Sequence, residues 1–199
     1  MNMCIVTLLA VVLLTACTTS VAPPEHPPEY TEPPVVTTDN AIRIVVSTDV
    51  PMGLTELRAF LVENPFIDYL VTTDSIAAPK DWESLHGTWL TPGASRRLRL
   101  EDGHFVIERI LENRPELFRY QIWTFTNAAG RGVEQIVGEQ RFFELSDRRT
   151  RFEWTYNVRP RSALTGWFVN RRKDELREYM QNGTDRMAAA ASGSIARAD

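Results

Sequence analysis

The amino-acid sequence predicts an α+β domain in which a run of antiparallel strands precedes one long C-terminal helix. Residues 152–158 alternate large apolar side chains with polar ones, a period of two that is typical of a strand with one buried face. The dipeptide Asp102-Gly103 separates two apolar segments and predicts a tight hairpin turn, because glycine tolerates a positive φ angle. After Pro160, apolar residues recur at helical spacing for about twenty-five residues, which predicts the closing helix.

The domain begins with one strand and two short helices. Residues 42–47 are rich in β-branched side chains and predict the first strand. Residues 54–61 place apolar side chains along one face of a short helix, which the following Asn64-Pro65 dipeptide ends. Residues 66–70 predict a second short helix or turn. Residues 72–92 show no clear period, so they predict an irregular segment anchored by tryptophans.

Further strands follow, separated by turns that contain glycine, proline, asparagine or aspartate. Their ranges are 97–100, 104–111, 117–125, 133–145 and 152–158. Gly138 interrupts the longest of them and predicts a bulge or bend at that point. We expect these strands to form a meander, because the turns between them are short.

The helical stretch after Pro160 has a broad apolar face and a charged one. The apolar face comprises Leu164, Trp167, Phe168, Leu176, Tyr179, Met180 and Met187. The run of basic residues at 171–173 lies on the polar side, where we expect solvent or, alternatively, lipid head groups. Asn182-Gly183 predicts fraying or a kink, and residues 192–199 predict a disordered tail.

The first residues of the chain predict export and attachment to a membrane. Residues 1–16 contain a short apolar run with the length of a signal-peptide core. Residues 14–17 read Leu-Thr-Ala-Cys and resemble the lipobox of bacterial lipoproteins, which implies that Cys17 is acylated after the signal is removed. Thr18 implies sorting to the outer membrane. Because residues 1–3 contain no Lys or Arg, a cleaved and soluble secretory protein is the alternative.

Residues 17–40 predict a linker between the lipidated cysteine and the domain. Three Pro-Pro pairs recur in it together with several glutamates, and proline favours extended backbone over packed elements. We expect a passive tether, with a proline-recognising partner as the alternative.

The composition of the chain limits the kinds of partner and binding site that we expect. The chain has 199 residues and a net charge of −4, with arginines scattered among acidic residues, so we expect no nucleic acid. Its two cysteines, Cys4 and Cys17, fall in the predicted signal and at the lipidation site. The domain therefore has no thiol for a disulfide or a cysteine-based metal site, and we expect no metal, no cofactor and a monomer.

The order of the elements and several local motifs resemble the START-like (SRPBCC) superfamily, also called the helix-grip fold, in its polyketide cyclase/dehydrase and lipid-transport branch. The motifs are Gly87-Thr88-Trp89 through Pro92-Gly93-Ala94, Arg97-Leu98-Arg99-Leu100, Asp102-Gly103 with Glu108 and Phe118-Arg119-Tyr120, and residues 151–156 followed by Pro160. The resemblance covers residues 41–191. It implies a seven-stranded curved antiparallel sheet wrapped around the long C-terminal helix, with an apolar cavity between them. Members bind lipids, sterols, hormones or aromatic molecules, and some catalyse cyclisation or dehydration.

The resemblance and the strand parities together name candidate residues for the lining of this cavity. They are Trp89, Ile107, Arg109, Phe118, Tyr120, Ile122, Trp154, Tyr156, Trp167 and Phe168. An inward Arg109 or Arg141 requires a partner, because burying an unpaired charge is costly. Such an arginine would hold an anionic group of the ligand; alternatively it reaches the rim or pairs with Glu108 or Glu153.

The sequence therefore predicts a membrane-anchored periplasmic lipoprotein that binds a hydrophobic or amphipathic, lipid-like small molecule. The alternatives are an enzyme of the polyketide cyclase type and a structural or interaction lipoprotein whose interior is filled by its own side chains. For the enzyme, His86 is the candidate acid–base group, and Glu108 with Glu153 is a candidate carboxylate pair. We expect His104, after the hairpin turn, to be exposed.

Overall fold

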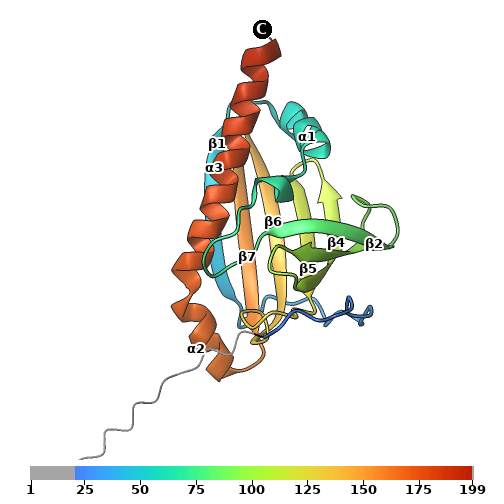
Figure 1. Ribbon diagram of the computed structural model, residues 1–199. Helices are drawn as coiled ribbons and strands as arrows, with labels where there is room; N and C mark the ends of the chain where they lie inside the picture. The colour runs from blue at the N-terminus through green and yellow to red at the C-terminus, as the bar shows by residue number, and fades with distance from the viewer. Residues whose placement is uncertain (1–20, 199) are drawn as a thin grey trace, which may run out of the picture.

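One antiparallel sheet of seven strands organises the computed structural model, which describes residues 21–198. The strands are β1 (Ile42–Val50), β2 (Pro79–His86), β3 (Ser95–Leu100), β4 (Phe105–Arg114), β5 (Leu117–Trp123), β6 (Val133–Ser146) and β7 (Arg149–Pro160). Their order in space is β1-β7-β6-β5-β4-β3-β2 (Figure 1). Strands β3 to β7 form the predicted meander, β2 extends it at one edge, and β1 joins it at the β7 edge.

Helices cover the inner face of this curved sheet. α1 (Leu54–Glu63) and the 3-10 helix η1 (Phe66–Tyr69) follow β1, and α2 (Ala163–Arg171) and α3 (Lys173–Ala198) follow β7. α3 runs along β1 and past η1 (Figure 1). The predicted fold class is confirmed: a seven-stranded curved antiparallel sheet, two short helices after the first strand, and a long C-terminal helix.

The segment at residues 72–92 contains a strand that the sequence prediction missed. β2 lies at the edge of the sheet, and nearly all of its side chains are exposed or half-buried. A strand without a buried face shows no period of two, so hydrophobicity gives no sign of it. Ion pairs of Glu83 with Arg97 and of Asp81 with Arg99 join it to β3 instead.

The helical stretch after Pro160 is two helices rather than one. The break lies at Arg172, and Asn182-Gly183 continues α3 without interruption. Gly183 packs closely against Leu70: a Cβ at this position would lie 2.5 Å from Cδ2 of Leu70, so the leucine side chain would have to move to admit any other residue. α3 also continues to Ala198, where a disordered tail was predicted from residue 192. The run of four alanines at 188–191, directly before this segment, favours helix strongly, and Ala191 is fully buried.

The main core lies between the inner face of the sheet and α3. Phe152, Trp154 and Tyr156 on β7 are buried on this face, as the period of two predicted. Met180 and Met187 of α3 are fully buried against the sheet. These side chains fix the distance between the helix and the sheet, and hence the position of the cavity described below.

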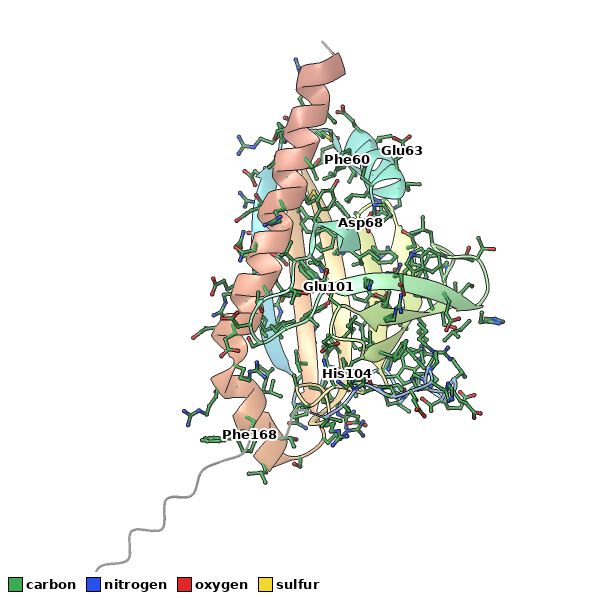
Figure 2. All side chains as sticks on the ribbon, viewed as in Figure 1. Phe60, Glu63, Asp68, Glu101, His104 and Phe168 are labelled. Atoms are coloured by element: carbon green, nitrogen blue, oxygen red, sulfur yellow. The ribbon has the colours of Figure 1, made fainter. Side chains whose placement is uncertain are left out.

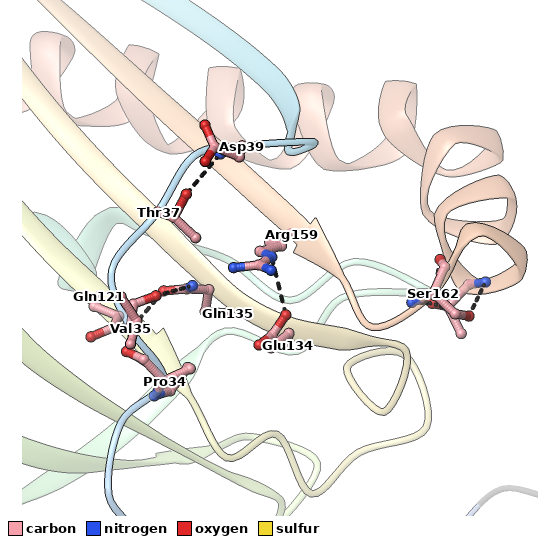
Figure 3. A network of polar contacts seen from close by, with 10 residues as sticks. Pro34, Val35, Thr37, Asp39, Gln121, Glu134, Gln135, Arg159 and Ser162 are labelled. Carbon is pink, nitrogen blue, oxygen red and sulfur yellow. Dashed lines mark hydrogen bonds and ion pairs between the residues drawn. The ribbon is translucent and has the colours of Figure 1, made fainter.

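Residues 21–40 form an N-terminal strap that packs on the outer face of the sheet. The amide group of Gln121 donates to the carbonyl of Pro34 at 2.9 Å, and that of Gln135 donates to the carbonyl of Val35 at 2.8 Å (Figure 3). Both glutamines are fully buried. Residues 21–40 were expected as part of a passive tether; they pack instead, because extended proline-rich backbone leaves carbonyls available to side-chain donors.

A tryptophan holds the preceding part of the strap. The indole nitrogen of Trp123 donates to the carbonyl of Thr31 at 3.0 Å, and its ring meets Tyr30 edge-on with centroids 6.0 Å apart.

The predicted signal at residues 1–16 and the acylation at Cys17 lie outside the described residues. Among residues 21–198, no helix is both long and apolar enough to cross a bilayer.

Candidate functional site

A cavity of about 570 Å³ lies between the inner face of the sheet and the helices that cover it. Its walls come from β3 to β7, from α1, η1, α2 and α3, and from the loop that precedes β6. The predicted residues that line it are Trp89, Phe118, Tyr120, Ile122, Trp154, Tyr156 and Phe168. Phe118, Tyr120 and Ile122 share one face of β5, and Trp154 and Tyr156 share one face of β7, so strand parity brings these five side chains to the same side of the sheet as the cavity.

Three predicted lining residues lie elsewhere. Ile107 and Arg109 belong to the outer face of β4, where Ile107 is buried and Arg109 donates to Oε1 of Gln121 at 2.9 Å. Both faces of β4 are covered, one by the cavity wall and the other near the strap, so the strand shows no clean alternation that would orient it. Trp167 is 53% exposed on α2 and does not line the cavity.

Four charged residues line the cavity wall, and two of them, Arg96 and Glu108, form a buried pair that the sequence prediction did not identify. Arg96 on β3 lies opposite Glu108 on β4, and both side chains are 5% exposed. Nε and Nη2 of Arg96 lie 2.8 Å and 2.7 Å from the same carboxylate oxygen, Oε2. Close pairing offsets much of the cost of burying each charge. Glu108 is thus paired as the alternative prediction allowed, but with Arg96 rather than Arg109.

Aromatic rings hold the guanidinium group of Arg96 in place. Its central carbon lies 3.6 Å from the ring centroid of Trp89 and 5.5 Å from that of Trp82. The sequence carried a signal for this position: Arg96 has the same parity as Leu98 and Leu100, which both line the cavity. Extending the predicted strand at 97–100 by one residue would have pointed Arg96 inward.

A buried hydroxyl cluster lies on β5 and β7, the two strands that flank β6. The indole nitrogen of Trp154 donates to the hydroxyl oxygen of Tyr120 at 2.8 Å. Burial raises the pKa of Tyr120 far above its usual value, and the negative charge of Glu108 raises it further. Burial also raises the pKa of Tyr156 well above its usual value. Both hydroxyls therefore stay protonated at neutral pH and are available as neutral hydrogen-bonding groups.

Gly138 makes room for this cluster. It pairs with Tyr120 on one side and with Tyr156 on the other, in regular register, so the predicted bulge is not present at this residue. A Cβ on Gly138 would lie 2.3 Å from Cζ of Tyr120. The tyrosine ring lies across the position where any other residue would carry its side chain.

The candidate acid–base groups do not come together. His86 is exposed at the end of β2 and does not line the cavity. Glu153 has the opposite parity from the inward residues of β7, so it lies on the outer face, away from Glu108. Arg141 is likewise outside, in an ion pair with Glu139. Among residues 21–198, no group of three or more potential metal ligands is present.

His104, expected to be exposed, is buried beside the strap. Its Nδ1 lies 3.0 Å from Oγ1 of Thr126, and its Nε2 lies 3.1 Å from the carbonyl oxygen of Val21. The hairpin turn before it is open to solvent, but the strap covers the histidine itself. Because Val21 and His104 are far apart in the sequence, no local sequence pattern predicted their contact.

No protein-family model and no curated protein sequence matches this chain. Solved structures do match. Ara h 8.0201 is 12% identical and covers 77% of this chain and 99% of its own, with a TM-score of 0.53. An aromatase/cyclase from Streptomyces is 16% identical, over 78% and 96% of the two chains, with a TM-score of 0.53.

Norcoclaurine synthase from Thalictrum flavum, solved as a point mutant with a transition-state analogue, is 11% identical over 78% of this chain and 98% of its own, with a TM-score of 0.55. At these identities the likeness concerns architecture alone. Together with the strand order and the closing helix, it establishes that residues 42–198 adopt the helix-grip, START-like fold.

Proposed function

We propose that this protein is a lipid-anchored binding protein of the cell envelope that holds a hydrophobic or amphipathic small molecule in its cavity. The observation that carries the proposal is the cavity of about 570 Å³. Small-molecule sites occupy roughly 300–1,000 Å³ and are walled mainly by apolar side chains with a few polar groups. The lining residues here follow that pattern, with aliphatic and aromatic side chains surrounding Arg96, Glu108 and the tyrosine hydroxyls.

At the sheet wall of the cavity, the polar groups favour a ligand whose head is uncharged but hydrogen-bonding. The other two arginines of the lining have their own partners: Arg172 is paired with Glu175, and Arg58 donates to Asn113. Arg96 and Glu108 neutralise each other within one pair, so a fully charged ligand group would have to compete with that pair. Tyr120 and Tyr156 add neutral hydroxyls nearby. An alcohol, ester or amide joined to a long apolar part matches this combination.

A matched pair of tryptophan substitutions on α2 tests the cavity. Val169 lines it, whereas Leu164, on the same helix, is 68% exposed and does not. Val169→Trp should weaken binding of the neutral fluorophore N-phenyl-1-naphthylamine about tenfold or more by occupying its space, while Leu164→Trp leaves the affinity unchanged. Native mass spectrometry of the purified protein should detect an apolar small molecule. Equal affinities for both variants would exclude the cavity as the site.

The anchor is proposed from residues 14–17 and has its own test. We propose that Cys17 is acylated and that the protein faces the periplasm from the outer membrane. A metabolically supplied alkyne fatty acid should label the wild type and the Cys4→Ala control but not Cys17→Ala. An unlabelled wild type would exclude the anchor and leave the binding proposal standing.

The positions of the candidate residues do not favour the two alternative functions, a cyclase-type enzyme and an interaction lipoprotein. The cyclase-type enzyme relied on His86, which lies outside the cavity, or on Glu108 with Glu153, which lie on opposite faces of the sheet. The interaction lipoprotein required an interior filled by side chains, which the cavity volume does not favour.

A further inference from the structure

Helix α2 presents an apolar face to solvent. Leu164, Trp167 and Phe168 are 68%, 53% and 55% exposed, and their spacing of three and four residues places them on one side of the helix. None of the residues of α2 is buried. A cluster of large exposed apolar side chains on a soluble domain marks a docking surface. We call these three residues the α2 patch.

The surroundings of the α2 patch are basic. Arg171 lies one turn further along the same side, with its guanidinium carbon 4.8 Å from the ring centroid of Trp167. Residues 124–133 and 155–173, which surround the patch, contain arginines and one lysine but no aspartate or glutamate. Arg159 is paired with Glu134 and Arg172 with Glu175, whereas no ion pair among the described residues involves Arg131, Arg161, Arg171 or Lys173, so this surface keeps a positive character. Such a surface complements anionic lipid head groups.

The predicted membrane anchor joins the domain at this same end. Val21, where the described chain begins, contacts His104, and His104 contacts Thr126 at the start of the loop that precedes β6. That loop in turn packs at the start of α2: the amide of Arg161, just before the helix, donates to the carbonyl of Gly132 at 2.9 Å, and a Cβ on Gly132 would lie 3.1 Å from Cβ of Thr165 in α2. His104 and Phe168 lie toward the same end of the molecule in Figure 2. The apolar run within residues 1–16 and Cys17 precede Val21 by a few residues.

We propose that the α2 patch docks onto an anionic lipid bilayer, with Leu164, Trp167 and Phe168 in the boundary between head groups and acyl chains. Aromatic and leucine side chains flanked by arginine are typical of helices that lie in this interface. Phe168 and Val169 also line the cavity, so docking sets the α2 wall of the cavity against the membrane. This assigns the ligand class as lipids or molecules dissolved in the bilayer; that assignment rests on the proposed function, whereas docking itself does not.

Tryptophan quenching tests the docking with the full chain. The protein is reconstituted into vesicles of phosphatidylcholine and phosphatidylglycerol with and without dibrominated acyl chains, and no ligand is added. Brominated lipid should quench part of the wild-type fluorescence, and Trp167→Phe should lose that quenched part. Trp82→Phe removes another partly exposed tryptophan, on β2, and should retain it. High salt should weaken the quenching, because the basic residues contribute to docking.

Two results would overturn the proposal. The first is quenching that is equal in the wild type and in Trp167→Phe, since α2 would then stay outside the lipid however the N-terminal segment is held. The second is a concentration-dependent dimer in detergent, seen by analytical ultracentrifugation and lost in Trp167→Phe, which would assign the patch to a second copy of the chain. Because neither measurement involves the cavity ligand, failure here is distinguishable from failure of Val169→Trp to weaken binding.

Discussion

Burying a guanidinium group costs several kcal/mol unless a carboxylate accompanies it, and Arg96 and Glu108 meet that condition at the cavity wall. Two tryptophan rings, of Trp89 and Trp82, add cation–π attraction to the guanidinium of Arg96. The consequence is a polar point that stays electrically neutral inside an apolar space. The stability of the fold around this site depends on both charges of the pair being present.

Removing one charge of this pair should therefore destabilise the fold strongly. Glu108→Gln leaves Arg96 buried without its counter-charge and should cost about 3–5 kcal/mol of the free energy of unfolding. The control is Glu112→Gln on the same strand, whose ion pair with Arg114 is partly exposed and should contribute at most about 1 kcal/mol. Urea unfolding followed by tryptophan fluorescence measures both. Similar small losses would mean that Arg96 reaches solvent or another acceptor when Glu108 is neutral.

The packing of the N-terminal strap on the sheet is the feature of the fold that local sequence patterns predict least well. The prolines of the strap predict extended backbone, and residues 21–40 form neither helix nor strand. The donors that bind the carbonyls of the strap, Gln121, Gln135 and Trp123, come from β5 and β6 about ninety to one hundred residues away. The strap also explains why Ile107 and Arg109 were assigned to the wrong face of β4. A strand that is covered on both faces shows no alternation of polar and apolar residues that would indicate its orientation. Edge strand β2 was missed for the opposite reason, because neither of its faces is buried.

Proteolysis should show that the strap is held. Glu-C protease cleaves after glutamate, and Glu29 lies beside Tyr30 within the packed segment. Gln135→Ala removes the donor to Val35 and a contact with Gln121, which should cost about 1–3 kcal/mol and speed cleavage after Glu29 about tenfold or more.

Gln140→Ala is the matched control for the strap, because Gln140 is a buried glutamine of the same strand that lines the cavity on the other face. It should leave the cleavage rate near that of the wild type. Rapid cleavage after Glu29 in the wild type itself would contradict a strap packed on the sheet and would favour the tether that the sequence predicted. Mass spectrometry of the fragments over time gives these rates.

At the scale of the whole molecule, the strand order and closing helix follow from features that sequence carries locally: alternation, short turns and a helical period. The cavity does not, because it depends on distances between elements. Gly138 and Gly183 show why: one admits the ring of Tyr120, the other admits Leu70, and each contact joins distant segments. The break at Arg172 likewise separates α2, in which no residue is buried, from α3, whose apolar face is buried against the sheet, although both carry the same apolar spacing.

Three buried tyrosines from different elements make global stability sensitive to alkali. Tyr120 on β5, Tyr156 on β7 and Tyr179 on α3 all have pKa values raised above the ordinary value near 10, in each case chiefly by burial. Above about pH 10 the unfolded chain loses phenolic protons that the folded chain keeps, so the folded state binds more protons and the free energy of unfolding falls as pH rises. Below that pH the contribution is fully present.

The expected slope is about 1.4 kcal/mol per pH unit for each such tyrosine above pH 10. Urea unfolding at several values between about pH 9 and 11.5 measures it, and Tyr156→Phe should make the slope shallower by one tyrosine's share while Tyr30→Phe, on the half-exposed Tyr30 of the strap, should change it little. A stability that stays flat across this range would mean that hydroxide and water reach the phenols in the folded protein. The cavity would then be a wetter space than its aromatic walls imply, and an apolar ligand would gain less by entering it.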